Sequence, residues 1–323
     1  MSGPRAARTG LTVLGETMAA LSPDHVGPLR HARGLGLSVA GSESTVAIGA
    51  RRLGHPAAWV GRVGDDELGR LVLTRLRGED LDVHAVTDPL APTGLMLKER
   101  PSAGQGRVHY YRAGSAGSRL SPADLPDGLL ERTRVLHCSG IALALSATAR
   151  DAAHTAMRRV RAAGGTVSFD LNHRARLWGE DEARTAWSAV LPLADVVFAS
   201  ADEAALLCGA PADGLAALGR ALRAYGPHTV VITDGAAGAV SVSPAGTVPV
   251  AAVPVTAVDP VGAGDAFVAG YLSALLDDLP EEHRMRRAAA VAALCVAAEG
   301  DWEGLPERDR LGTAGAEAGA VAR

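Results

Sequence analysis

The chain has 323 residues, 47% hydrophobic but only 3% aromatic, so its core must be built mainly from Ala, Val and Leu. Its formal net charge of −4 argues against nucleic acid or an anionic membrane as the main partner. Three cysteines, Cys138, Cys208 and Cys295, lie far apart without a CxxC pair, which argues against a disulfide framework and a zinc site.

No targeting or membrane segment is apparent. The N-terminal residues include arginines, but no apolar segment follows them as in a secretory signal. The longest apolar run, residues 288–298, is too short to cross a bilayer. We therefore expect a soluble cytoplasmic protein.

The first third of the chain is predicted to be rich in short strands. Residues 11–15 form a buried strand, and residues 21–39, with their prolines and glycines, are typical of short strands and turns. A helix follows from about residue 42 to Gly54, since Ser or Thr at the start and Gly at the end are ordinary caps. A strand at residues 57–60 then leads into another helix that ends near Leu76.

A regular alternation of strands and helices begins near Val135. It is preceded by a second β-rich patch at residues 93–99 and 107–112, which interrupts this rhythm. Alternation at this spacing predicts a parallel sheet with helices on both faces, and the early β-rich patches predict a separate small sheet. The later strands are expected at 135–138, 166–170, 196–198 and 230–233, with helices between them that include 146–163 and 180–190.

Residues 258–267 form the stretch that carries the chemistry. A strand predicted over 247–258 leads into a Gly-rich turn, and a helix is expected over 266–276. The amides of Gly262, Ala263 and Gly264 can form an anion hole at the helix start, with Asp265 as general base. A purely structural turn, with Asp265 as a helix cap, is the alternative.

Other phosphate-binding signatures are missing. No Gly-Lys pair exists for a Walker A loop, and a GxGxxG fingerprint fails because its third position is Phe267. Phosphoryl transfer from a nucleotide to a hydroxyl needs an anion hole and a carboxylate base, which is what this turn offers.

Residues 259–265, DPVGAGD, resemble the C-terminal signature of the ribokinase-like sugar kinases, the PfkB family. Residues 41–45 and 61–69 resemble the N-terminal signature of the same family, and the resemblance extends from about residue 11 to residue 310. It implies an α/β fold with a doubly wound, mostly parallel sheet flanked by helices and a small β-sheet lid.

The resemblance also implies how the chain is divided. We expect one ribokinase-like kinase domain over residues 1–312, with a discontinuous lid from about 16–40 and 92–115. Residues 313–323, rich in Ala and Gly, are expected to be a disordered tail. A homo-oligomer formed through the lid is the expected assembly.

Within the family, the chain is most similar to the 2-keto-3-deoxygluconate kinases. This similarity implies ATP-dependent phosphorylation of 2-dehydro-3-deoxy-D-gluconate, a sugar acid, to the 6-phosphate. Arg112 and Arg174 are then the candidates for binding the substrate carboxylate, because guanidinium groups bind carboxylates bidentately. The matching segments are residues 15–16, 110–116, 139–141, 170–174, 177–178 and 300–306.

The resemblance implies a complete set of site residues. Glu203 would help to organise Mg²⁺ through water, and Asp259 matches a position that binds a monovalent cation such as K⁺ in several family members. The substrate contacts would be Gly41, Ser42, Thr45, Tyr110, Tyr111, Arg112, Arg174, Asp265 and Asp301. The ATP contacts would be Asn172, Arg174, Ser200, Thr233, Gly235, Gly238, Gly262 and Gly264.

Three positions depart from the pattern of this subgroup. Thr45 replaces an Asn, Met96 replaces a Tyr, and Ser200 begins the NxxE motif. The first two leave open a kinase for another sugar, such as fructose or another deoxy-keto sugar acid. An aldolase would need a Schiff-base lysine, but Lys98 is the only lysine and belongs to a predicted lid strand far from the Gly-rich turn. A sugar-sensing protein without activity is the non-enzyme alternative.

Overall fold

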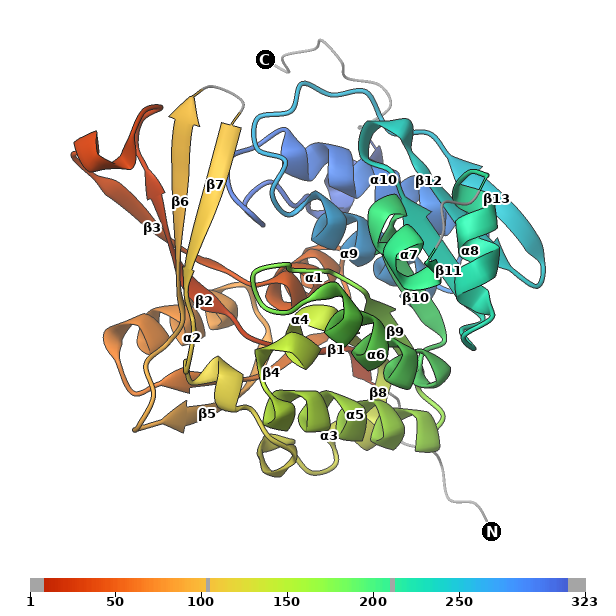
Figure 1. Ribbon diagram of the computed structural model, residues 1–323, viewed down its shortest axis with the longest axis horizontal. Helices are drawn as coiled ribbons and strands as arrows, with labels where there is room; N and C mark the ends of the chain where they lie inside the picture. Colours follow the sequence, from red (N-terminus) through yellow and green to blue (C-terminus); the bar gives the residue numbers. More distant parts are fainter. Residues whose placement is uncertain (1–8, 103–104, 210–212, 313–323) are drawn as a thin grey trace.

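The computed structural model describes residues 9–102, 105–209 and 213–312. Figure 1 shows a main body with a smaller sheet standing at one side of it. The tail expected at residues 313–323 lies outside the described residues.

The main body is built on a nine-stranded sheet in the order β13–β12–β11–β10–β9–β8–β1–β4–β5, as far as the described residues show. Its strands pair in parallel except at one edge, where β12 and β13 are antiparallel. The mostly parallel sheet predicted from the sequence is confirmed. The strands are β1 (Thr9–Leu14), β4 (Ala57–Gly64), β5 (Asp82–Asp88), β8 (Thr133–Ser139), β9 (Thr166–Asp170), β10 (Val196–Ser200), β11 (Thr229–Thr233), β12 (Ala239–Ser243) and β13 (Gly246–Val250).

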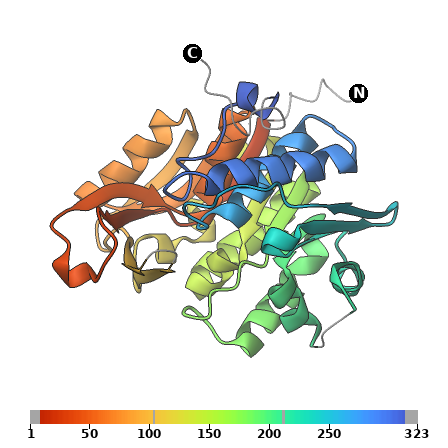
Figure 2. The same cartoon turned by 90° about the horizontal axis from the view of Figure 1, so that it is seen from above.

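Helices cover both faces of this sheet, as Figure 2 shows from above. One face carries α1 (Ser42–Arg52), α2 (Glu67–Gly78), α9 (Ala263–Leu276) and α10 (Glu281–Val296). The other carries α3 (Leu129–Arg132), α4 (Gly140–Leu145), α5 (Ala147–Ala162), α6 (Glu180–Val190), α7 (Ala201–Cys208) and α8 (Leu215–Arg223).

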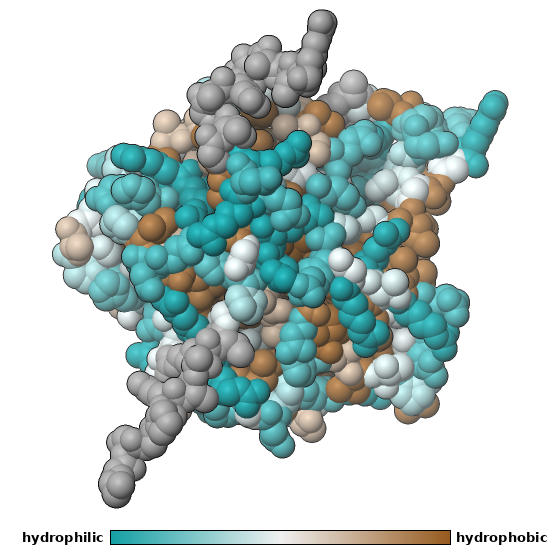
Figure 3. Space-filling view, turned by 180° about the vertical axis from the view of Figure 1, so that it is seen from behind, coloured by the Kyte–Doolittle hydropathy of each residue, from teal (hydrophilic) through white to brown (hydrophobic). Residues whose placement is uncertain are grey.

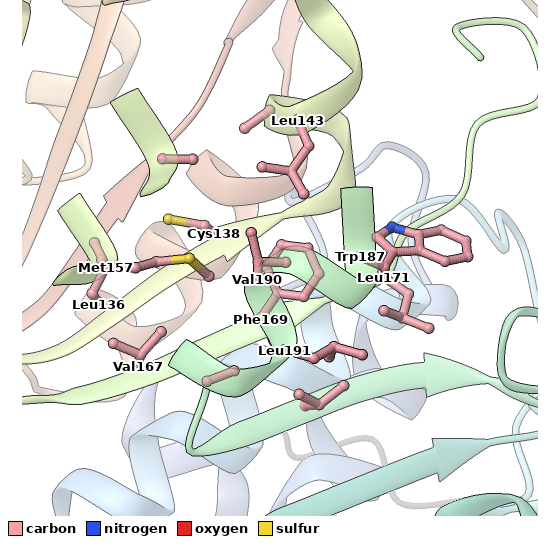
Figure 4. Close-up of a cluster of buried hydrophobic side chains, with 14 of the residues drawn as sticks. Leu136, Cys138, Leu143, Met157, Val167, Phe169, Leu171, Trp187, Val190 and Leu191 are labelled. Carbon is pink, nitrogen blue, oxygen red and sulfur yellow. The ribbon is translucent and has the colours of Figure 1, made fainter. Parts of the chain in front are cut away.

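Successive strand residues supply the two cores in turn. In β10, Val196 and Phe198 pack with one set of helices, whereas Val197 and Ala199 pack with the other. This alternation follows from the two-residue period of a strand, and it explains why the strand reads as continuously apolar. Figure 4 shows one of the cores, where Met157 and Phe169 are fully buried beside aliphatic side chains.

A second, four-stranded sheet has the order β3–β2–β6–β7. Its strands are β2 (Met18–Pro23), β3 (Leu35–Ala40), β6 (Leu95–Ser102) and β7 (Gln105–Tyr111), so both predicted β-rich patches contribute to it. We call it the small sheet. One of its faces carries a small apolar cluster that contains Met18, Met96 and Tyr110.

The prediction of a continuous strand over residues 247–258 is wrong. The strand β13 ends at Val250, and residues 251–260 have no regular structure. β13 is an edge strand that pairs only with β12 in the described structure. Pro254 has no N–H to donate to a strand ladder. Val253, Val255 and Val258 are exposed, so these apolar side chains gain no burial that would hold the segment as a strand.

Hydrophilic side chains dominate the face seen in Figure 3, where hydrophobic residues form small separate patches. Among the described residues, no helix combines the length and the apolar character needed to cross a membrane.

The order of the strands places a topological switch point between β1 and β8. After β1, the large sheet grows outward through β4 and β5, and then in the other direction through β8, β9, β10 and β11. The connections at the carboxyl ends of β1 and β8 therefore diverge, and in open α/β sheets ligands bind at such a switch point.

Candidate active site

The Gly-rich turn places a helix N-terminus beside the carboxyl ends of β9, β10 and β11. Gly262 precedes α9 with φ 83°, and no side chain caps the helix. A Cβ atom on Gly262 would lie 2.2 Å from the backbone oxygen of Asp301, so only glycine allows the turn to pack there. At the start of α9 the N–H of Ala263 makes only a long contact, 3.4 Å, to the backbone oxygen of Pro260, and the helix dipole favours an anion at this end.

Asp265 is held by a chain of hydrogen bonds between α9, α1 and the end of β9. Ser42 Oγ donates to Asp265 Oδ1 at 2.5 Å, and Asn172 Nδ2 donates to Ser42 Oγ at 2.9 Å. The same Asn172 amide also reaches Asp170 Oδ2 at 3.3 Å. Predicted residues that lie far apart in the sequence thus meet around one carboxylate.

The carboxylates of this site have raised pKa values. Burial raises the pKa of Asp265, although the Ser42 hydrogen bond and the charge of Arg174 oppose the rise. Burial also raises the pKa of Asp170 well above its ordinary value, and the charges of Glu203 and Asp265 add to this effect. A carboxylate with a raised pKa is a stronger base, which suits Asp265 to accept a proton.

Glu203 forms a capping box with Ser200 at the start of α7, which follows β10 directly. Its carboxylate accepts from the backbone N–H of Ser200 at 2.8 Å and from that of His173 at 2.6 Å. The second bond helps to hold the turn in which Asn172 has φ 38°. Each carboxylate oxygen of Glu203 therefore already accepts one backbone hydrogen bond. Contact with a metal ion through water is compatible with this arrangement.

Two cavities adjoin the turn. A polar cavity of ≈ 290 Å³ contains Asp265, Asp170, Arg174 and Glu203 in its wall. A larger cavity of ≈ 600 Å³ is lined mainly by apolar residues of β13, the 251–257 segment and α10. Thr233, Pro260, Ala263, Gly264 and Phe267 line both cavities. An apolar space and an acid-lined space therefore meet at the helix N-terminus.

The predicted ATP contacts lie along these two cavities. The polar cavity is lined by Asn172, Arg174, Ser200, Thr233, Gly262 and Gly264. The apolar cavity is lined by Thr233, Gly235, Gly238 and Gly264.

The two candidate arginines have different surroundings. The Arg112 guanidinium is buried, and it pairs with the buried Glu16 at 2.5 Å, while Ser115 also donates to Glu16. Arg174 lines the polar cavity, and no carboxylate of residues 9–102, 105–209 or 213–312 lies within ion-pair distance of it. Arg174 is the cation that remains available to a ligand.

The remaining predicted substrate contacts are more scattered. Tyr110 lies beneath Arg112, with the guanidinium carbon 5.6 Å from the ring centroid, whereas Tyr111 on the opposite face is 63% exposed. Gly41 precedes α1, and Thr45 is buried within its first turns. Neither Tyr111 nor Thr45 lines the two cavities.

Lys98 does not lie far from the Gly-rich turn, and that prediction is wrong. Its ammonium lies 3.2 Å from Asp259 Oδ2 and 2.5 Å from Asp301 Oδ1. Burial opposes the charge, but the two carboxylates outweigh it and raise the pKa of Lys98. No local sequence pattern indicates this contact, because the small sheet brings Lys98 to Asp259, which lies more than a hundred residues away in the chain.

The family model for pfkB carbohydrate kinases matches residues 8–308 of this chain. The chain belongs to this family. Among its relatives, the 2-dehydro-3-deoxygluconokinase of Thermoproteus tenax is 38% identical over 311 residues, covering 94% of this chain and 93% of the relative. The 2-dehydro-3-deoxygluconokinase of Bacillus subtilis strain 168 is 37% identical over 303 residues, covering 92% of each. The 2-dehydro-3-deoxygalactonokinase of Haloferax volcanii is 35% identical, covering 90% of this chain and 92% of the relative.

Solved structures of carbohydrate kinases have the same fold. A PfkB protein from Polaromonas sp. JS666 matches with a TM-score of 0.86 and 37% identity, covering 94% of this chain and 99% of that chain. A putative ribokinase II from E. coli in complex with ATP and Mg²⁺ matches with a TM-score of 0.86 and 25% identity, covering 95% and 98%. The predicted ribokinase-like fold is confirmed.

Three buried carboxyl groups of this pfkB-family chain lie in segments that resemble the family, but no role was predicted for them. Asp170 ends β9, Glu16 follows β1, and Glu43 lies in the first turn of α1, where Ser139 Oγ donates to it at 2.6 Å. Burial raises the pKa of Glu43 to about 7. An acid at the carboxyl end of a parallel strand was the available signal for Asp170 and Glu16; Glu43 had none beyond its place in the N-terminal signature.

Proposed function

We propose that this chain transfers the γ-phosphoryl group of ATP to a hydroxyl of 2-dehydro-3-deoxy-D-gluconate, forming the 6-phosphate and ADP. The observation that carries the proposal is the placement of Asp265 at the N-terminus of α9, held by Ser42 at 2.5 Å. Asp265 takes the proton of the hydroxyl as its oxygen attacks phosphorus. The amides of Gly262, Ala263 and Gly264 stabilise the negative charge of the transferred group.

The two adjoining cavities support a nucleotide with its base in one and its phosphates in the other. The apolar cavity beside Gly235 and Gly238 suits a purine ring, and the polar cavity suits phosphates and the reacting hydroxyl. Thr233 at the carboxyl end of β11 and Gly264 lie where the two meet. The relation to an ATP-bound neighbour is consistent with this arrangement.

Mg²⁺ fits the site as an ion held mainly by phosphates and water. The described residues contain no group of three or more His, Cys, Asp or Glu side chains that could hold a metal by themselves. Glu203 and Asp170 line the polar cavity, and one or two carboxylates with phosphates are the usual environment of Mg²⁺. When bound, the ion neutralises charge on the phosphates.

Replacement of Asp265 tests the reaction. Asp265→Asn keeps the shape of the side chain but cannot accept the proton, so we expect kcat to fall on the order of 10²–10⁴-fold. A coupled ADP-release assay with 2-dehydro-3-deoxy-D-gluconate, its galactonate epimer and fructose would measure this. Turnover by Asp265→Asn at the wild-type rate would refute the base, and turnover of fructose alone would refute the sugar-acid substrate.

The arginines test the substrate class. Because Arg174 is not paired with a carboxylate among the described residues, we expect Arg174→Met to raise KM for the sugar acid on the order of 10²-fold, with less effect on fructose. Arg112→Met should instead lower stability by about 3–5 kcal/mol, because it leaves the buried Glu16 unpaired. The double variant Glu16→Gln/Arg112→Met is the matched control. Equal losses for acid and neutral sugars would contradict a carboxylate role for Arg174.

Two alternative functions are less well supported. A Schiff-base aldolase needs a lysine of lowered pKa, but the pKa of Lys98 is raised by its carboxylate partners. A sugar sensor without activity would not need Asp265 as a general base. The Asp265→Asn assay tests this alternative directly.

A further inference from the structure

The chain's only lysine lies in a buried charge cluster. Lys98 projects from β6 of the small sheet to the carboxylates of Asp259 and Asp301, at 3.2 and 2.5 Å, and all three side chains are at most 13% exposed. Asp259 begins the Gly-rich turn, whereas Asp301 belongs to the loop that follows α10. One ammonium group therefore joins three segments that are distant in the sequence.

The cluster lies directly behind the anion hole. Asp259 Oδ1 accepts from the N–H of Val261 at 3.1 Å, within the turn itself. Gly262 packs against the backbone of Asp301. A cation here holds the turn at Asp259 against the loop at Asp301. The relative position of these two segments sets the orientation of the amides of Gly262 to Gly264.

Asp259 is also where the family resemblance places a monovalent cation, and the residues present do not fit one. Its Oδ2 atom already accepts from Lys98 at 3.2 Å and from the N–H of Gly300 at 3.4 Å, and its Oδ1 accepts from Val261. A second cation between these carboxylates would have to displace or oppose the ammonium. We propose that Lys98 takes the place of the monovalent cation, so that this kinase needs no K⁺.

In this arrangement the cation, the ammonium group of Lys98, belongs to the small sheet. A free ion can bind the turn whatever the position of the small sheet, but Lys98 reaches Asp259 only when β6 lies against the turn. Two other side chains of the small sheet reach the same loop: Arg100 pairs with Glu299 at 3.0 Å, and Ser38 donates to Glu303 at 2.6 Å. The order of the anion hole is therefore coupled to the docking of the small sheet.

The first test uses the wild-type protein, and its kinetic part rests on the proposed function. We expect kcat and KM to be unchanged when KCl is replaced by choline chloride at equal ionic strength. The melting temperature and the affinity for ATP should also be the same with and without K⁺. Activation of the wild type by K⁺ or stabilisation by it, beyond the effect of choline, would overturn the proposal.

The second test removes the ammonium. In choline buffer, Lys98→Met should lose on the order of 10²-fold in kcat, because the anion hole is no longer held in place. Since the variant leaves two carboxylates around a gap, K⁺ or NH₄⁺ should restore activity by about tenfold and raise the melting temperature. Arg100→Met, which removes the neighbouring ion pair of the same strand, is the matched control and should gain nothing from K⁺.

The outcomes separate the inference from the proposed function. If no sugar acid is phosphorylated, the proposed function fails, but the effect of K⁺ on melting and ATP binding still decides the role of Lys98. Equal responses of Lys98→Met and Arg100→Met to K⁺ would show that the ammonium is only a structural tie, which would also overturn the proposal.

Discussion

Glu43 shows how strongly this site changes the properties of a single residue. Its carboxyl group is 1% exposed, accepts a hydrogen bond from Ser139, and is close enough to Asp265 for the two charges to repel. Gly15 makes room for it, because a Cβ atom there would lie 2.3 Å from Glu43 Oε2. Burial, and to a smaller extent this repulsion, favour the neutral form, so that near neutral pH Glu43 carries less than a full negative charge beside Asp265.

The raised pKa of Glu43 predicts a pH dependence of stability. A carboxyl group whose pKa rises from 4.5 to about 7 on folding stabilises the native state fully below pH 4.5 and loses that contribution as the pH rises to about 7. The loss amounts to about 3 kcal/mol. Urea unfolding at several pH values between 4.5 and 8 should show a smaller fall in Glu43→Gln than in the wild type, with a remainder from Asp265 and Asp170, whose pKa values are also raised. Parallel pH profiles for the two proteins would contradict a buried, neutral Glu43.

At the scale of elements, the catalytic geometry depends on where the Gly-rich turn ends and α9 begins. Gly262 has φ 83° and its Cα hydrogen faces the backbone oxygen of Asp301, whereas a Cβ atom on Gly264 would meet no atom within 4 Å. The two glycines of this motif thus differ. Gly262 is needed for its backbone conformation and its packing, whereas Gly264 leaves space free beside the polar cavity.

This difference predicts the effects of two alanine substitutions. Gly262→Ala combines an unfavourable φ, at about 1–2 kcal/mol, with a clash against the Asp301 backbone, so we expect a lower melting temperature and a kcat reduced on the order of 10²-fold. Gly264→Ala should keep the melting temperature of the wild type, although its methyl group would face the ligand. Thermal melting of both variants, followed by the ADP-release assay, measures this. Equal melting temperatures would show that the turn can relax.

The elements that could be predicted are those fixed by local pattern. The apolar strand β9 and the helix α6 were placed at their observed bounds, because each has a strong periodicity and clear ends. The edge strand β5 was missed, since its mostly half-exposed residues alternate weakly and its pairing with β4 defines it. The contact of Lys98 with Asp259 lay equally beyond sequence reasoning, because it depends on how the small sheet docks.

At the scale of the whole molecule, the small sheet has two faces with different tasks. Met96, Lys98 and Tyr110 share the face that turns toward the Gly-rich turn, since paired residues and alternate residues of strands lie on one side. The opposite face carries Leu37 and Tyr111, which are 47% and 63% exposed. We take this exposed apolar face as a candidate interaction site. If two copies buried it against each other, the faces that carry Met96, Lys98 and Tyr110 would be held toward the active sites of both copies.

We therefore predict a homodimer formed through the outer face of the small sheet, as the sequence led us to expect. Leu37→Asp should convert the protein to a monomer, because it would place a carboxylate in the apolar interface without a partner. Light scattering coupled to size-exclusion chromatography at micromolar concentration measures the mass.

Leu90→Asp is the control, because Leu90 is 80% exposed yet lies outside the small sheet, after β5. A wild-type protein that elutes as a monomer would refute the dimer, and a Leu37→Asp variant that remains dimeric would place the interface elsewhere. If Leu37→Asp is a monomer and its KM for the sugar acid rises while Leu90→Asp is unaffected, the dimer helps to hold the small sheet against the site.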